Sequence, residues 1–145
     1  MHTLSPASRD SVIGTRQAVP AVSGRVSRRL LALFFVIAGV LHFAFTADYM
    51  RIMPPWLPWH RALVILSGTC EIAGGIGVLP RRTRRWAGCG LIALCIAVLP
   101  ANVQMLLDAQ AAGASTAWLA LLWLRLPLQL LLVGWIWRAT RRARA

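Results

Sequence analysis

The chain has 145 residues, of which 58% are hydrophobic and 14% are charged, whereas about 25% of the residues of a typical soluble domain are charged. Its mean hydropathy of +0.63 implies more apolar surface than one water-soluble core can hide, which argues against a soluble globular protein. The net charge of +12 comes from sixteen cations, all arginine. Because these arginines flank apolar stretches, the orienting rule of membrane proteins explains them, and we expect a lipid bilayer and no nucleic acid as partner.

The composition divides the chain into three regions. Residues 1–26 mix Ser, Pro, Gly, Thr and charged residues without a helical or strand period, which predicts a disordered cytoplasmic tail. The apolar stretch begins too late for a secretory signal peptide. Residues 27–138 are predicted to form one membrane domain, and residues 139–145 a basic cytoplasmic tail.

Four segments approach the length of about 20 apolar residues that a helix needs to cross the hydrocarbon of a bilayer. Pro100 and Pro127 lie inside the third and fourth segments, and neighbouring helices can satisfy the backbone groups that a proline frees. The sequence therefore predicts an all-α, polytopic membrane protein, a bundle of four transmembrane helices. The predicted helices cover residues 30–46, 62–79, 86–107 and 117–137.

The distribution of arginine predicts the orientation of these helices. With four spans, thirteen of the sixteen arginines fall on the side of the N-terminal tail, the loop at residues 81–85 and the C-terminal tail. The opposite side holds Arg51 and Arg61. Because positive charge accumulates in cytoplasmic loops, we expect both termini in the cytoplasm and a multi-pass protein of a bacterial-type cytoplasmic (inner) membrane.

The first outer loop, residues 48–61, differs from the other connections. Its three prolines and two tryptophans make it semi-rigid and amphipathic. Two interpretations remain open at the level of sequence. The loop rests in the headgroups as an interfacial anchor, or it forms a lid over a site at the helix ends.

Polar residues within the predicted spans are the informative ones, because a polar or charged group in hydrocarbon is costly and usually faces the bundle interior, a partner or a water-filled cavity. Counting about 1.5 Å per residue from each membrane entry places polar groups from all four helices at a similar depth in the outer half. We expect them to converge on one site. They are His42 in the first helix, Ser67 and Glu71 in the second, Asn102 and Gln104 in the third, and Arg125 and Gln129 in the fourth.

Spacing supports this convergence, because Ser67 and Glu71 are four residues apart, as are Arg125 and Gln129, so each pair shares one helix face. We expect Glu71 to contact Arg125 directly, since a guanidinium cannot lose its charge. His42 would complete the network or transfer protons near neutral pH. The alternative is a purely structural network that holds the helices together.

The cysteines and histidines point to no further chemistry. Cys70, Cys89 and Cys95 contain no C-x-x-C pair, and we expect them to pack as small apolar residues, with a contact between Cys70 and Cys95 left open. The three histidines form no cluster at zinc-like spacing, so no metal site is expected.

Five sequence blocks resemble the DoxX-like family of small four-helix membrane proteins. They begin at Ala38 (AGVLHF), Pro54 (PPWLP), Ser67 (SGTCEIAGG), Pro100 (PANVQM) and Arg125 (RLPLQ). The resemblance covers residues 30–137 and implies a four-helix bundle in which the polar motif residues are grouped. The family is named after a subunit of a thiosulfate:quinone oxidoreductase, and relatives are linked to membrane redox complexes and oxidative-stress defence. Carried over to this chain, the implied site consists of His42, Glu71, Asn102, Arg125 and Gln129.

We therefore expect a membrane subunit or accessory of a quinone-linked redox complex. As an enzyme it would be non-autonomous, with electrons supplied by a soluble oxidoreductase, because the chain has no haem-ligand pair or cysteine cluster to carry them. The alternatives are a non-enzymatic assembly protein and, with less support, a transporter of a small solute or protons; a homo-oligomer is left open. The predicted catalytic residues are Glu71, Arg125 and His42, and the predicted ligand-binding residues are Ser67, Asn102 and Gln129, around a site for a quinone.

Overall fold

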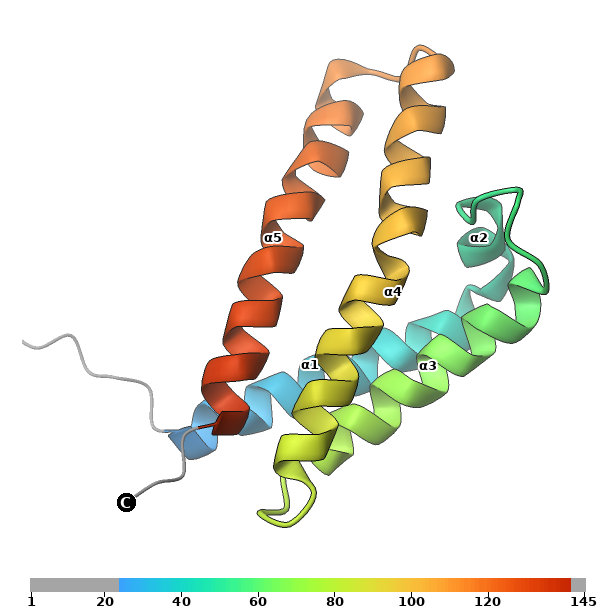
Figure 1. The fold of residues 1–145 in the computed structure, drawn as a ribbon. Coiled ribbons are helices and arrows are strands. Elements are labelled where there is room, and N and C mark those ends of the chain that lie inside the picture. Colours follow the sequence, from blue (N-terminus) through green and yellow to red (C-terminus); the bar gives the residue numbers. More distant parts are fainter. Residues whose placement is uncertain (1–23, 142–145) are drawn as a thin grey trace, which may run out of the picture.

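The structure, a computed structural model, describes residues 24–141, and the regular secondary structure of this part of the chain consists of helices joined by turns and loops. The predicted all-α class is confirmed. Figure 1 shows the helices in chain order: α1 (Gly24–Ala44), α2 (Thr46–Arg51), α3 (His60–Gly77), α4 (Arg84–Ala111) and α5 (Thr116–Arg141).

Three of these helices, α1, α4 and α5, are long and apolar enough to cross a membrane. Many of their large apolar side chains are exposed on the surface of the chain, including Leu33, Leu130 and Leu131, as expected for helices surrounded by lipid. These features indicate a membrane protein. The fourth predicted span corresponds to α3, which is not one of the three. Its 18 residues begin with His60 and Arg61 and also include Glu71, which lower its mean hydropathy.

The helices extend beyond the predicted boundaries at both ends of the chain. The first helix begins at Gly24, so residues 24–26 of the predicted tail are helical; the rest of that tail, residues 1–23, lies outside the described residues. The last helix continues to Arg141 and takes in residues 139–141 of the predicted basic tail. Pro100 and Pro127 lie within α4 and α5, as predicted.

The long helices form two pairs. The first pair, α1 and α3, packs side by side, and α4 and α5 form the second pair. In Figure 1 the pairs meet near the start of α1 and the end of α5, and they diverge towards α2 and the turn between α4 and α5. We call the first of these the basic end and the second the far end. The described arginines at the basic end are Arg25, Arg28, Arg29, Arg81, Arg82, Arg84, Arg85, Arg138 and Arg141.

Glycine allows the first pair to pack backbone against backbone. A Cβ atom added at Gly39 would lie 2.6 Å from the carbonyl oxygen of Gly68, and one added at Gly75 would lie 2.9 Å from that of Ala32. Both distances are too short for a side chain. Small residues at these positions therefore set the approach of α1 to α3, as in other membrane helix pairs.

The core of the protein lies where the two pairs meet at the basic end. Leu31, Leu91 and Ile136, from α1, α4 and α5, are almost completely buried there. Arg84 donates from Nε to the carbonyl oxygen of Val78 at 3.1 Å and from Nη2 to that of Leu79 at 2.9 Å. These bonds satisfy carbonyl groups just beyond the end of α3, a place where helices leave acceptors unpaired.

Candidate functional site

A cavity of about 650 Å³ opens between the two helix pairs in the part of the bundle where they diverge. Its wall is largely apolar and receives residues from all five helices, among them Phe35 and Leu128. Of the seven polar residues expected to converge on one site, six line this one cavity. They are His42, Ser67, Glu71, Asn102, Arg125 and Gln129. Gln104 does not line it, and its Nε2 donates instead to Oδ1 of Asp108 at 2.8 Å.

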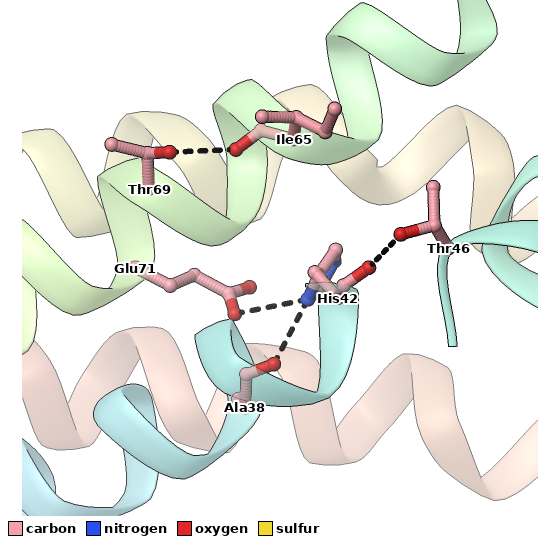
Figure 2. Close-up of polar contacts among 6 residues, drawn as sticks. All are labelled: Ala38, His42, Thr46, Ile65, Thr69 and Glu71. Atoms are coloured by element: carbon pink, nitrogen blue, oxygen red, sulfur yellow. Dashed lines mark hydrogen bonds and ion pairs between the residues drawn. The ribbon is translucent and has the colours of Figure 1, made fainter. Parts of the chain in front are cut away.

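Figure 2 shows that Glu71 of α3 points towards His42 of α1. Oε2 of Glu71 lies 3.4 Å from Nδ1 of His42, and the two side chains are 12% and 11% exposed. The same Nδ1 donates a hydrogen bond of 2.9 Å to the carbonyl oxygen of Ala38. The imidazole proton is thus directed at the backbone, and Oε2 of Glu71 is buried with no hydrogen-bond partner among the described residues.

The predicted contact between Glu71 and Arg125 is wrong in this structure. Oε2 of Glu71 lies against the imidazole of His42, 3.4 Å from Nδ1, while Nη1 of Arg125 lies 3.2 Å from the sulfur of Met105. The physical reason is the arrangement of the helices. Glu71 belongs to the first pair and reaches its neighbour α1, whereas Arg125 belongs to α5 in the second pair, across the cavity.

Asn102 and Gln129 join the two helices of the second pair. Nδ2 of Asn102 donates to Oε1 of Gln129 at 3.0 Å. The amide nitrogen of Gln129 donates in turn to the carbonyl oxygen of Cys95 on α4. Both side chains line the cavity, but they are bonded to the protein, which is the interhelical role that the structural alternative predicts.

Tyr49 of α2 is a cavity residue that the site prediction from sequence missed. Its ring stacks on that of His42, with the centroids 4.0 Å apart and an angle of 21° between the planes. Burial raises the pKa of the Tyr49 phenol, the charge of Glu71 adds to the increase, and the charge of Arg125 opposes it. Tyr49 therefore lies within the electrostatic reach of both side chains. The only signal in the sequence was its place in the unusual loop at residues 48–61.

The loop at residues 48–61 contributes side chains to the cavity wall. Ile52 and Met53 line the cavity. Pro54 is almost fully buried, and its carbonyl oxygen lies 3.1 Å from Nε2 of His60. Trp56 and Trp59, by contrast, are strongly exposed, at 68% and 81%. The first part of the loop thus lines the cavity, and an interfacial anchor at its tryptophans stays a prediction.

The cysteines contribute no disulfide or metal site in residues 24–141. All three are free, so the contact left open between Cys70 and Cys95 is not a disulfide; Cys70 is exposed, whereas Cys95 is buried and lines the cavity. The described part of the chain contains no group of three or more His, Cys, Asp or Glu residues arranged to hold a metal ion.

Comparison with known proteins gives one match. A family model described as a domain of unknown function (DUF8561) matches residues 31–140. The chain belongs to this family. The DUF8561 match includes all six predicted site residues and the whole cavity lining. No curated protein and no solved structure matches the chain, and the resemblance to the DoxX-like family stays a prediction.

The DUF8561 cavity has an apolar wall and a few polar groups, a combination that suits a mostly apolar ligand with one polar group. Its volume falls within the range of about 300–1,000 Å³ that is usual for small-molecule sites, which are mostly apolar with a few convergent polar groups. With Nδ1 of His42 donating to Ala38, a neutral imidazole has its lone pair on Nε2 and accepts a proton there. The chemistry that these side chains can supply is therefore hydrogen bonding and proton transfer.

Proposed function

We propose that this protein binds a lipid-soluble quinone in the cavity and serves as the membrane subunit of a quinone-linked redox or oxidative-stress complex. The observation that carries the proposal is the buried Oε2 of Glu71, which has no hydrogen-bond partner in the described chain and lies in a largely apolar cavity. A buried carboxyl group without a partner is costly. A ligand with a polar oxygen and an apolar ring would relieve that cost. The DoxX-like resemblance supports the same ligand.

The proposed topology has four spans, with the basic end in the cytoplasm. Three helices have the length and apolarity of spans. The fourth helix, α3, returns from the far end to the basic end alongside α1, which supports a fourth span at α3. Nine described arginines lie at the basic end, and positive charge favours the cytoplasmic side. The cavity would then open in the outer half of a bacterial-type inner membrane.

The residues present fit a quinone. Apolar side chains such as Phe35 and Leu128 form walls for the ring, and Tyr49 extends the aromatic surface beside His42. When bound, a quinone supplies two-electron redox chemistry, with electrons from a soluble oxidoreductase. The chain's own residues would bind the ring, exclude water and move protons: Glu71 at Oε2 and His42 at Nε2 exchange protons with the ligand, while Arg125 provides positive charge across the cavity.

The experiment is purification in lipid nanodiscs followed by mass spectrometry of extractable quinone and of co-purifying proteins. We expect stoichiometric quinone with the wild type, together with a soluble oxidoreductase, and loss of the quinone in Glu71→Gln. Asp108→Asn is the matched control, because Asp108 is an exposed carboxylate outside the cavity. Lipid without quinone in the wild type, or equal quinone in Glu71→Gln and Asp108→Asn, would contradict the proposal.

A second candidate function is a non-enzymatic assembly protein, favoured by the bonds among Asn102, Gln129 and Cys95 that tie α4 to α5. On that account, Gln129→Leu lowers thermal stability in detergent and recovery of the partner protein together. A ligand effect would be absent. Recovery of a partner without any quinone would favour this function over the first.

A further inference from the structure

The polar groups of the cavity divide into those that the protein satisfies and those that it leaves free. Asn102 and Gln129 are bonded to each other, and Nδ1 of His42 is bonded to the backbone. Two groups of the cavity lining are poorly satisfied by the described chain. One is Oε2 of Glu71 on α3, which is buried without a hydrogen-bond partner. The other is the guanidinium of Arg125, an exposed residue of α5 that lines the cavity.

Arg125 is poorly satisfied by its own chain. A guanidinium is always charged and has five N–H donors, yet the partner found for it is the thioether sulfur of Met105, a weak acceptor. An arginine within a membrane segment requires an anion, backbone carbonyls or water to offset the loss of hydration.

None of the acidic residues in the described part of the chain forms an ion pair with Arg125. Asp48 pairs with Arg51 at 3.3 Å, and Asp108 accepts a hydrogen bond from Gln104. Glu71 lies against His42. Within residues 24–141, Arg125 therefore has no carboxylate within ion-pair distance.

We infer that the cavity prefers a ring ligand with two oxygen substituents, one of which is ionised, so that the anionic oxygen pairs with Arg125 while the other, a carbonyl oxygen, accepts a hydrogen bond from the protonated carboxyl group of Glu71. This inference rests on the proposed function and narrows its ligand class to lipid-soluble hydroxyquinones that are anions at neutral pH. The walls of the cavity hold the ring, and the two helix pairs each supply one polar contact. An ion pair made in a site of low dielectric is stronger than one made in water.

The test compares two probes that differ in one group. The first is a 2-hydroxy-3-alkyl-1,4-naphthoquinone, whose ring hydroxyl is ionised at neutral pH, and the second is its 2-methoxy ether, which has no proton to lose. Affinities are measured by equilibrium binding to the full chain in nanodiscs of zwitterionic lipid. We expect the wild type to bind the hydroxyquinone at least about tenfold more tightly, equivalent to about 1.4 kcal/mol.

Variants at Arg125 test whether its positive charge causes the preference for the hydroxyquinone. Arg125→Gln should bind both probes with similar affinity, and Arg125→Lys, which keeps a positive charge, should retain a preference for the anion. Arg61→Gln is the control, because Arg61 is exposed at the start of α3 and does not line the cavity. If Arg125→Gln does not fold, loss of the preference in Arg125→Lys would still overturn the charge argument.

The outcomes separate this inference from the proposed function. Equal affinity of the wild type for both probes would overturn the inference and leave quinone binding intact, whereas binding of neither probe above empty nanodiscs would overturn both. An anionic oxygen can also come from a phospholipid headgroup. A preference that disappears when the nanodiscs contain phosphatidylglycerol would assign Arg125 to lipid and overturn the assignment to a ring ligand.

Discussion

At the basic end of the bundle, α1, α3, α4 and α5 meet around Leu31, Leu91 and Ile136, and glycines bring helices into close contact. At the far end the same helices diverge, and polar side chains line a cavity of about 650 Å³ between them. The first half is filled by the protein itself. The second half leaves a carboxyl group and a guanidinium without good partners from the described chain. We infer from this difference that the basic end maintains the fold, whereas the far end has room for a ligand.

The largest effect is expected from overfilling the packed half. Gly75→Ala would place a Cβ atom 2.9 Å from the carbonyl oxygen of Ala32 and 3.1 Å from Cβ of Phe35, and overpacking of this kind costs about 1–3 kcal/mol. Thermal unfolding in detergent should show a clear fall in Tm. Gly90→Ala is the control, because nothing lies within 4 Å of an added Cβ there and alanine favours a helix by up to about 1 kcal/mol. Equal Tm values for the two variants would show that the glycine contacts do not hold the helices together.

A smaller effect, on binding alone, is expected from the cover of the cavity. Tyr49→Ala removes the ring stacked on His42, and an aromatic contact contributes about 0.5–1.5 kcal/mol beyond its buried area. Quinone affinity in nanodiscs should fall severalfold while Tm stays close to the wild-type value. Phe45→Ala serves as the control, since Phe45 is exposed and does not line the cavity. A large fall in Tm without a change in affinity would mean that Tyr49 stabilises the fold and does not contact the ligand.

The smallest effect should come from the bond between the helices of the second pair. A double-mutant cycle with Asn102→Ala and Gln129→Ala measures the coupling across their 3.0 Å hydrogen bond. Measured interhelical bonds of this kind average about 0.6 kcal/mol in membranes, and we expect a coupling of that order in detergent unfolding. Additive effects of the two substitutions would show that this hydrogen bond does not stabilise the protein.

Sequence reasoning predicted the helical class and the gathering of six polar residues more closely than it predicted their contacts. The positions of His42, Glu71 and Asn102 along apolar helices follow from counting residues, because helical rise is uniform. The partner of Glu71 does not follow from such a count, since it depends on which helices pair and where the pairs diverge. Arg125 lies at a comparable depth to Glu71, but on the other pair.

Two further features, the position of Tyr49 in the cavity and the character of α3, could not be predicted from the sequence pattern, because they depend on how the helices pack. Tyr49 was assigned to the loop at residues 48–61. The sequence around Phe45, where α2 begins, contains no proline or glycine that would predict a break between α1 and α2. The span at α3 was predicted from its apolar residues, yet Glu71, Ser67 and Thr69 reduce its apolar character. The packing of α3 beside α1 depends on tertiary contacts, such as that of Gly39 with Gly68, which the sequence pattern does not reveal.

The most direct test of the central claim, that the far half of the bundle holds a ring ligand, is photo-cross-linking with an azidoquinone in nanodiscs. The account predicts labels on cavity residues of several helices, such as Phe34, Leu94 and Leu132, and their loss when excess unlabelled quinone competes. Labels confined to lipid-exposed residues outside the cavity, such as Leu130, and insensitive to competition, would contradict it.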